Sequence, residues 1–420
     1  MLTSCGVNKG NDKKLFFKQD VYLLLTFYGS RTLQFQNKKI MKKAISMLLV
    51  MTAITMFLGS VTCKKNETTS VIDDWEVIID KNKKDSTDTD PVKPPQEDKK
   101  PFFKMRGIIA SWSDVNNPSK IDYIQIAKDN GINTFSIFNA DRKSLMWKNF
   151  AERCADAKID LEYEEHMLAF LIPRDLFEKH PDYFRMDEKG NRVNDANGCP
   201  SSAGALKEVY KNAIEIARNY QPTNNRYYFW LDDGGGICHC DKCKNLNASD
   251  QALIFENEII KAIKTINPNA MLAHLCYHNT VDAPAKIKPS EDIFLEFAPF
   301  TRSWTSPLSH TWIRASGSSL THADYLKSLK DNLKIFPVET AQVLEYWMDA
   351  SLFSGWNPNK LVKVPWNNDI FLDDINIYAS LGIKNITCYT AYVGPNYVTK
   401  FGDISFLTEY GQGLLNYQPK

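Results

Sequence analysis

The sequence lacks an excess of charge of either sign. Its 420 residues contain 51 Lys and Arg and 50 Asp and Glu, which gives a formal net charge of +1. Proteins that bind nucleic acid or an anionic membrane surface usually carry a clear basic patch. The charge balance therefore points away from both kinds of partner. Hydrophobic residues make up 43% of the chain and aromatic residues 12%, which is enough for a substantial core.

Apolar residues are scarce between residues 80 and 101. Residues 80–101 read DKNKKDSTDTDPVKPPQEDKKP and combine charged residues, Ser, Thr and Pro with almost no apolar side chain. A segment of this composition cannot bury enough apolar surface to fold. We therefore expect residues 64–100 to be a disordered linker that holds a folded domain of residues 101–420 away from a membrane.

The segment before this linker has the order of an export signal. A basic run at residues 37–43 is followed by a largely apolar run at residues 44–60 and then by Cys63. We expect Cys63 to be the lipidated first residue of a bacterial lipoprotein, although Ser60-Val61-Thr62 departs from the usual Leu, small residue, Gly or Ala. Cleavage without lipid and an uncleaved anchor helix are the alternatives.

This interpretation sets the expected organisation of the N-terminus. Met41 is expected to be the true start, because a signal peptide rarely follows so long a leader. Residues 1–40 are then a leader assigned upstream in error, and residues 41–63 are the signal peptide. The expected location is the cell envelope, with the membrane contacted only through the N-terminal lipid anchor.

No glycine-rich turn follows the first apolar run of the expected domain. The run at residues 105–112 continues as Ser113-Asp114, whereas a doubly wound open sheet would place a phosphate-binding turn there. Eight apolar runs alternate with amphipathic stretches over about 315 residues, which is the number of units and the size of a (β/α)8 barrel. We therefore predict an α/β fold of the TIM-barrel type. The runs expected to form strands are residues 105–112, 132–139, 159–167, 227–233, 271–278, 293–300, 341–348 and 383–392.

Helices are expected between these runs. Asn117-Pro118-Ser119 is a typical helix start, Gly131 is a typical helix end, and Asn267-Pro268 ends another helix. The expected helices are residues 119–130, 142–157, 203–220, 249–266, 321–333, 369–381 and 403–416.

A barrel fold predicts the place of the active site, because barrel enzymes bind substrates at the C-terminal ends of their strands. The residues that close the apolar runs include carboxylates, imidazoles and many aromatic rings. Such a cleft suits sugars, whose C–H faces pack on aromatic rings while their hydroxyl groups bind polar side chains. Cleavage of a glycosidic bond needs one protonated carboxyl group and one ionised partner.

Three stretches carry motifs of a known family. His166–Cys199 contains Pro-x-x-x-Phe, His-Pro-x-Tyr-Phe and Gly-x-Arg, Asp233-Gly234 precedes Cys-x-Cys-x-x-Cys, and Leu344–Phe353 is an acidic and aromatic strand end. Together they resemble a bacterial family known as domain of unknown function 4838, which is grouped with barrel glycoside hydrolases and is distantly similar to α-glucuronidases and β-hexosaminidases. The resemblance covers residues 100–415 and implies a barrel glycoside hydrolase with a carbohydrate substrate.

Asp232 and Asp233 close the fourth run, where hexosaminidase-like enzymes place an acidic pair. Because side chains alternate along a strand, only one of the two can point into the barrel mouth. The resemblance favours Asp233 as the general acid and leaves Asp232 to orient a substrate group or to cap the loop. Alternatively, both carboxylates only bind the backbone amides of Gly234–Gly236.

The second catalytic carboxylate is expected at the end of another run. Glu345 closes the seventh run and is the candidate nucleophile or base. Glu296 is a weaker candidate, because a glutamate in the middle of a strand is more often a buried structural residue. Glu164 and Glu165 are further candidates.

Six residues near the run ends are candidates for substrate binding. His166 closes the third run, and Arg302 follows the sixth, where a guanidinium could pair with a uronate carboxylate. The alternatives are a structural histidine and an ion pair with a loop acid. Four aromatic residues could form the wall of the cleft or pack in the core: Trp230, Tyr277, Trp304 and Trp347.

Four cysteines lie on two loops that a barrel brings to one face. Cys199 follows the third run, and Cys238, Cys240 and Cys243 follow the fourth. We expect them to form one structural zinc site, since four protein ligands leave no open position for catalysis. Two disulfides, Cys199–Cys238 and Cys240–Cys243, are the alternative in an oxidising compartment. The cysteines expected to be buried free thiols are Cys154, Cys276 and Cys388.

These observations predict an exported glycoside hydrolase with a carboxylate pair at the C-terminal face of its barrel. Two other functions stay open. A non-catalytic glycan-binding lipoprotein would keep the aromatic wall without two carboxylates at catalytic separation. A zinc hydrolase would need an open metal position.

Overall fold

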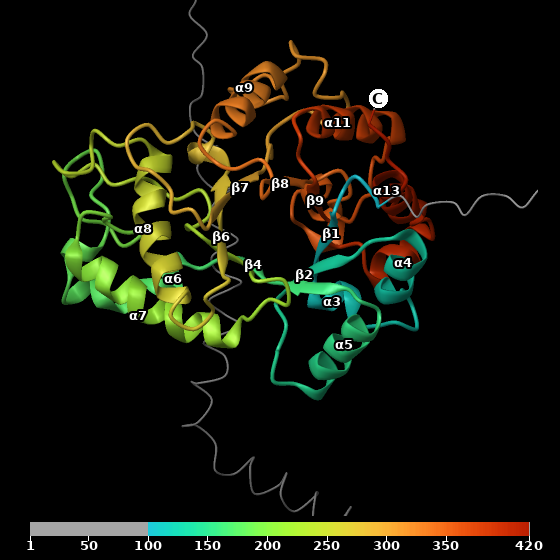
Figure 1. The fold of residues 1–420 in the computed structure, drawn as a ribbon, viewed down its shortest axis with the longest axis horizontal. Coiled ribbons are helices and arrows are strands. Elements are labelled where there is room, and N and C mark those ends of the chain that lie inside the picture. The colour runs from blue at the N-terminus through green and yellow to red at the C-terminus, as the bar shows by residue number, and fades with distance from the viewer. Residues whose placement is uncertain (1–99, 420) are drawn as a thin grey trace, which may run out of the picture. The chain divides into compact units, whose positions relative to one another are not determined.

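The computed structural model describes residues 100–419 (Figure 1). The expected leader of residues 1–40, the signal peptide of residues 41–63 with Cys63, and residues 64–99 of the expected linker lie outside the described residues and stay predictions. Within residues 100–419, no helix combines the length and the apolar character that crossing a membrane requires.

Nine parallel strands form one sheet in the order β3-β2-β1-β9-β8-β7-β6-β5-β4. β3 and β4 lie at opposite edges of this order, yet only Tyr163 separates them in the chain. This one segment pairs with β2 at its start and with β5 at its end, so it joins the two edges and closes the barrel. The strands are β1 (Met105–Ser111), β2 (Thr134–Phe138), β3 (Asp160–Glu162), β4 (Glu164–His166), β5 (Arg226–Trp230), β6 (Met271–Cys276), β7 (Ile293–Phe297), β8 (Gln342–Glu345) and β9 (Asn385–Tyr389).

This topology confirms the predicted (β/α)8 barrel. Each predicted run contains a strand, and the third run contains two, because the segment changes neighbour at Tyr163. Just after the change, the backbone N–H of Glu164 donates to the side-chain hydroxyl of Ser136 at 2.9 Å. The change of neighbour at Tyr163 divides the third run into two strands, so the sheet has nine strands although eight runs were predicted.

Seven helices cover the barrel close to their predicted positions, and most begin at a side-chain cap. Asp122 caps α4, and Asn247 and Asp250 form a capping box at the start of α8. Gly131 ends α4 at a left-handed φ of 72°, which glycine adopts without steric cost. The seven are α4 (Tyr123–Asn130), α5 (Leu145–Asp156), α7 (Ala203–Asn219), α8 (Ala248–Ile263), α9 (His322–Asn332), α11 (Asn368–Ser380) and α13 (Ser405–Leu415).

Shorter helices lie in the connections. The link between β6 and β7 contains only a 3-10 turn, η3 (His278–Thr280). The others are α3 (Trp112–Val115), α6 (Leu168–Leu171), α10 (Ala350–Phe353), α12 (Pro395–Phe401), η1 (Arg174–Glu178), η2 (Pro181–Tyr183) and η4 (Pro358–Lys360).

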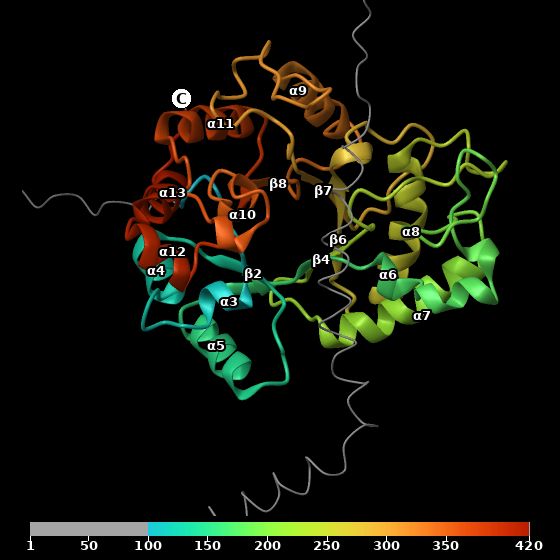
Figure 2. The same cartoon turned by 180° about the vertical axis from the view of Figure 1, so that it is seen from behind.

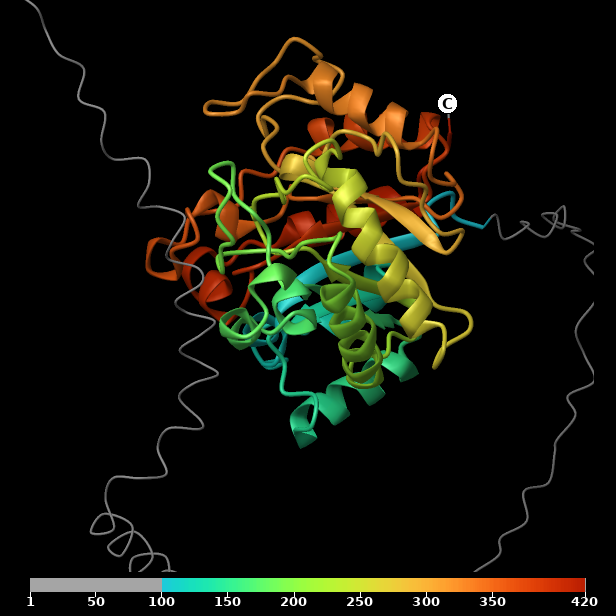
Figure 3. The same ribbon diagram turned by 90° about the vertical axis from the view of Figure 1, so that its left-hand side faces the viewer.

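The helices surround the strands in a ring. Figures 1 and 2 show α7 and α8 side by side on one flank, and α4, α11 and α13 on the opposite flank. In Figure 3 the yellow α8 crosses in front of the strands with the green α7 next to it. α13 packs against α4 and α11, so the last helix of the chain completes the ring beside the first long one.

Candidate active site

Asp233 lies just beyond the C-terminal end of β5. Gly234 follows it with a φ of 60°, a left-handed conformation that turns the chain away from the strand and suits glycine. The Asp233 side chain is 47% exposed, and its Oδ1 lies 3.9 Å from Nε2 of His166. The structure thus places this predicted acid where a ligand at the barrel mouth can reach it.

β4 and β5 hold His166 beside Asp233. The two strands pair so that His166 lies next to Trp230, and their ring centroids are 5.1 Å apart. Nδ1 of His166 is hydrogen-bonded to the carbonyl oxygen of Leu231, so Nδ1 carries the hydrogen and Nε2 faces Asp233. These contacts fix the orientation of the imidazole beside the carboxylate.

Aromatic rings form a continuous wall at this end of the barrel. Tyr277 packs on Phe300 with ring centroids 5.4 Å apart, Phe300 packs on Tyr346 at 5.1 Å, and Tyr346 stacks on Tyr389 at 5.2 Å. Trp356 extends the wall to the surface, because it lies 6.1 Å from Phe300 and is 43% exposed. Of these five rings, sequence analysis named only Tyr277 as a wall candidate, although Phe300, Tyr346 and Tyr389 also lie at the ends of predicted runs.

The pKa of Tyr389 is affected by carboxylates from several strands. Burial raises the pKa of its phenol well above the usual value, and the charges of Glu164, Asp349, Glu296 and Asp233 raise it further. Four carboxylates from four different strands or strand ends therefore add to the rise in the pKa of one phenol. Burial also raises the pKa of the Tyr277 phenol well above its usual value, and the charge of Asp233 adds to this rise.

Asp349 is the carboxylate that sequence analysis missed. It lies beyond the end of β8 and is 3% exposed, and burial raises its pKa to about 6. It accepts hydrogen bonds from the backbone N–H and the hydroxyl of Ser351, at 2.9 and 2.6 Å, and so caps α10. Its charge also raises the pKa of Tyr346 and Tyr392. An Asp two residues before a Ser at a helix start is an ordinary cap, so no sequence signal marks it as a site residue.

Glu164 and Glu296 lie deeper in the barrel. The indole N–H of Trp230 donates to Oε2 of Glu296 at 2.8 Å, and the amide of Gln342 donates to Oε1 at 3.2 Å. Both carboxylate oxygens of Glu164 are buried without a hydrogen-bond partner among the described residues. Burial raises the pKa of Glu296 to about 8 and that of Glu164 well above its usual value, and the Glu296 charge adds to the latter. These shifts favour the protonated form of both carboxyl groups.

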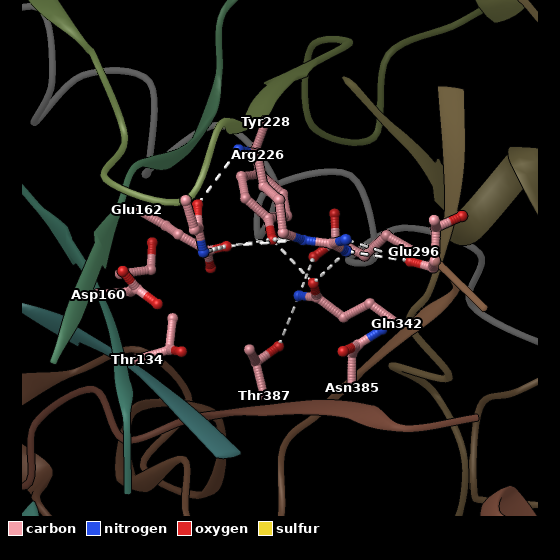
Figure 4. Close-up of polar contacts among 12 residues, drawn as sticks. Thr134, Asp160, Glu162, Arg226, Tyr228, Glu296, Gln342, Asn385 and Thr387 are labelled. Atoms are coloured by element: carbon pink, nitrogen blue, oxygen red, sulfur yellow. Dashed lines mark hydrogen bonds and ion pairs between the residues drawn. The ribbon is translucent and has the colours of Figure 1, made fainter. Parts of the chain in front are cut away.

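A polar network fills the barrel below them (Figure 4). Arg226 Nη2 donates to Gln342 Oε1 at 2.9 Å, and the Tyr228 hydroxyl bonds Glu162 Oε1 at 2.9 Å. The Arg226 guanidinium also lies 3.6 Å from the ring centroid of Phe294. These hydrogen bonds connect β3, β5 and β8 inside the barrel.

Asp232 anchors a loop and does not face the mouth. Its Oδ1 accepts from the backbone N–H of Ala169 at 3.0 Å, and its Oδ2 accepts from the N–H of Asn197 at 2.6 Å and forms an ion pair with Arg174. Asn197 Oδ1 in turn accepts from the Asp232 N–H at 3.0 Å. A Cβ at Gly235 would lie 2.5 Å from Asn197 Nδ2, so this close approach requires glycine. Of the predicted roles of Asp232, the contacts fit the loop cap.

Glu345, Arg302 and Trp347 lie outside the barrel wall, away from Asp233. The Tyr378 hydroxyl donates to Glu345, whose Oε2 lies 3.5 Å from Nε of Arg302. Arg302 also pairs with Asp374, which accepts from the Trp347 indole at 2.9 Å. Burial raises the pKa of Glu345 to about 7, against the opposing effect of Arg302. Both side chains are 0% exposed, so neither Glu345 nor Arg302 is open to a ligand.

Two remaining candidates border the site. Trp304 packs on Tyr346 of the wall at 5.8 Å, while the Arg302 guanidinium lies over its ring at 4.4 Å. Glu165 points the other way along its strand and pairs with Arg142 at 3.4 Å.

The four cysteines meet as the barrel geometry predicted. The sulfur atoms of Cys199, Cys238, Cys240 and Cys243 all lie within 4.8 Å of one another. All cysteines among the described residues are free, so neither predicted disulfide is formed. The buried free thiols are confirmed at Cys154, Cys276 and Cys388.

Solved structures with similar folds are distant. Gan42B, a GH42 β-galactosidase, has a TM-score of 0.45 and 12% identity, over 75% of this chain and 57% of its own. An O-GlcNAc hydrolase of Thermobaculum terrenum has a TM-score of 0.43 and 10% identity, over 76% and 61% of the chains. The catalytic domain of Thermobifida fusca endoglucanase Cel5A has a TM-score of 0.38 and 13% identity, over 69% and 78%. The chain thus spans less than two thirds of the length of the first two.

Sequence comparison identifies the family. Comparison with curated proteins finds no match. A sequence profile described as "Domain of unknown function (DUF4838)" matches residues 95–397, which include every strand of the barrel and all the mouth residues described above. The chain therefore belongs to the DUF4838 family.

Proposed function

We propose that this protein is a glycoside hydrolase in which Asp233 protonates the glycosidic oxygen as general acid. The observation that carries the proposal is the half-exposed Asp233 carboxylate at the C-terminal mouth of the barrel, beside His166 and a wall of aromatic rings. Barrel enzymes place their chemistry at this end. A pocket of rings with few polar groups suits a sugar ring and its hydroxyl groups.

We assign the second carboxylate to Asp349. Glu345 forms an ion pair with Arg302 and accepts a hydrogen bond from Tyr378. Asp349 follows the same strand, and its charge and that of Asp233 both add to the rise in the pKa of Tyr389. A nucleophile or base must be ionised, and the pKa of Asp349 is raised to about 6. Ionisation of Asp349 then sets the rising limb of the kcat/KM profile near pH 6, and loss of the proton from the general acid sets its falling limb.

His166 and the rings support this pair. Nε2 of His166 lies 3.9 Å from Oδ1 of Asp233, and the Nδ1 contact with Leu231 keeps the ring oriented. Trp356 has a positive φ of 55°, a conformation that costs about 1–3 kcal/mol in a residue other than glycine and clusters at ligand sites. Its exposed ring is the candidate platform for a sugar at the rim.

A hydrolysis panel tests the proposal. The protein is incubated with aryl glycosides that include uronides and N-acetylhexosaminides, together with the Asp233→Asn and Asp349→Asn variants. At least one glycoside should be cleaved, and each variant should lower kcat/KM by roughly 100-fold or more. The control is Asp241→Asn, an exposed acid on the same loop that pairs with Lys244. Glycan binding without cleavage, equal in parent and variants, would instead identify a binding protein.

A further inference from the structure

We propose that Cys199, Cys238, Cys240 and Cys243 form a structural zinc site that fixes the loop carrying Asp233. Cys199 comes from the excursion between β4 and α7, and the other three come from the loop after β5. All four are buried, between 0 and 7% exposed, in a cluster of their own that Met186 partly covers. The site itself does not depend on the proposed hydrolase activity; only its consequence for Asp233 does.

The distances between the sulfur atoms match a metal site. A zinc–sulfur bond of about 2.3 Å gives a regular tetrahedron with sulfur atoms about 3.8 Å apart. Sγ of Cys199 and Sγ of Cys240 are 3.8 Å apart, and all four sulfurs lie within 4.8 Å of one another. A disulfide would require about 2.05 Å between two sulfurs. Four thiolates around one point are therefore arranged for a tetrahedral ion.

The surroundings of the sulfurs suit an anionic metal–thiolate centre. Zn²⁺ with four thiolates has a net charge of about −2. The backbone N–H of Met186 donates to Cys238 Sγ at 3.3 Å, and Nη1 of Arg192 lies 3.9 Å from the same atom. Outer-shell donors of this kind hold metal ligands in place. Because four protein sulfurs complete a tetrahedron, no position stays open for a reacting water, and the role is structural.

The backbone around the cysteines is organised from α8. Oε1 of Gln251 accepts from the Cys238 N–H at 2.9 Å, and Nε2 of Gln251 donates to the carbonyls of Cys238 and Cys243 at 3.0 and 3.2 Å. This buried side chain fixes the conformation that turns the thiols toward one another.

The site links the two loops that hold Asp233. Asn197, just before Cys199, exchanges hydrogen bonds with Asp232 and donates its side-chain amide to the carbonyl of Gly236 at 3.0 Å. A zinc ion bound by the four cysteines would therefore hold the segment between β4 and α7 against the loop after β5, close to the contacts of Asn197. Loss of the metal should loosen the position of Asp233 without removing any mouth residue.

Metal analysis of the full chain, purified without added metal, tests the inference. We expect about one zinc per chain, which Cys238→Ser and Cys243→Ser should remove, with a lower Tm in each variant. Cys154→Ala, which removes a buried thiol on α5, should keep the zinc. Absence of zinc with the four cysteines found as disulfides by non-reducing mass spectrometry would overturn the inference, as would iron in place of zinc.

A second measurement covers the case in which the cysteine variants fail to fold. The parent protein is depleted of zinc with a chelator and reloaded with Co²⁺. Absorption of tetrahedral cobalt with thiolate charge-transfer bands would support the four-sulfur site, and an octahedral cobalt spectrum would contradict it. Both readouts are independent of glycoside cleavage, so failure of the proposed activity leaves this test intact.

Discussion

At the residue scale, the alternation of side chains along β8 decides which acid reaches the barrel mouth. Gln342 and Leu344 face the interior, where Gln342 bonds Glu296 and Leu344 packs near Trp230. Glu345 therefore points outward toward α11 and meets Arg302. The next carboxylate of this segment is Asp349, beyond the end of β8, whose charge adds to burial in raising the pKa of Tyr389. Glu345 therefore belongs to a buried ion-pair cluster with Arg302, and Asp349 is the carboxylate of this segment that we propose for the chemistry.

Substitutions in this outer cluster separate stability from activity. Glu345→Gln keeps an acceptor for Tyr378 and leaves Arg302 paired with Asp374, so kcat/KM should stay within roughly twofold of the parent. Arg302→Met leaves two buried carboxylates without a cation and should lower the free energy of unfolding by roughly 3–5 kcal/mol. Urea unfolding and hydrolysis assays measure the two effects. A large loss of activity in a well-folded Glu345→Gln protein would restore Glu345 as the catalytic partner.

At the element scale, loops held by buried polar contacts position the site. Asp232 connects the start of α6, the excursion at Asn197 and the end of β5. Its ion pair with Arg174 adds η1 to the same junction. One carboxylate thus sets the relative position of several segments next to Asp233, although it does not itself face the mouth.

Loss of the Asp232 contacts should increase the mobility of the segment between β4 and α7 more than that of the barrel strands. In Asp232→Asn, one oxygen acceptor becomes an N–H₂ donor that faces existing N–H donors, which costs roughly 1–3 kcal/mol locally. Hydrogen–deuterium exchange should accelerate in residues 167–202 and 231–236, while the amides of β1 and β9 keep their protection. Unchanged exchange in both segments would show that Asp232 does not hold them.

The same scale shows what sequence can and cannot predict here. The eight apolar runs predicted the strands because burial on a parallel sheet requires continuous apolar stretches. The break at Tyr163 left no signal, since the change of partner is set by barrel closure. The run ends located Asp233, His166 and Tyr277, but the direction of Glu345 depends on where β8 ends. Asp349 and Trp356 lie in loops beyond the strands, where no periodicity reveals orientation.

At the scale of the whole molecule, the barrel encloses ionisable groups that respond to pH. The pKa values of Glu162 and Glu296 are raised to about 7 and about 8, mainly by burial, and that of Glu164 is raised well above its usual value. Arg226 opposes the shift at Glu162. The folded protein therefore binds protons that the unfolded chain releases.

This arrangement predicts a fold that weakens as pH rises. A carboxyl group with a raised folded pKa makes its full contribution below its unfolded pKa, and the stability falls as pH rises toward the folded value. The urea midpoint should therefore fall between about pH 4.5 and about pH 8, the value to which the pKa of Glu296 is raised. Glu296→Gln keeps an acceptor for Trp230 and should flatten the slope. Stability that rises over this range would contradict the account.

The most direct test of the central claim is the dependence of Asp233→Asn on the leaving group. For the sugar that the panel identifies, aryl glycosides with poor and with good leaving groups are compared in parent and variant. A good leaving group departs without protonation, so loss of a general acid should slow only the poor substrate, by roughly 100-fold or more. That pattern would establish Asp233 as the acid. An equal loss on both substrates, or no loss on either, would contradict it.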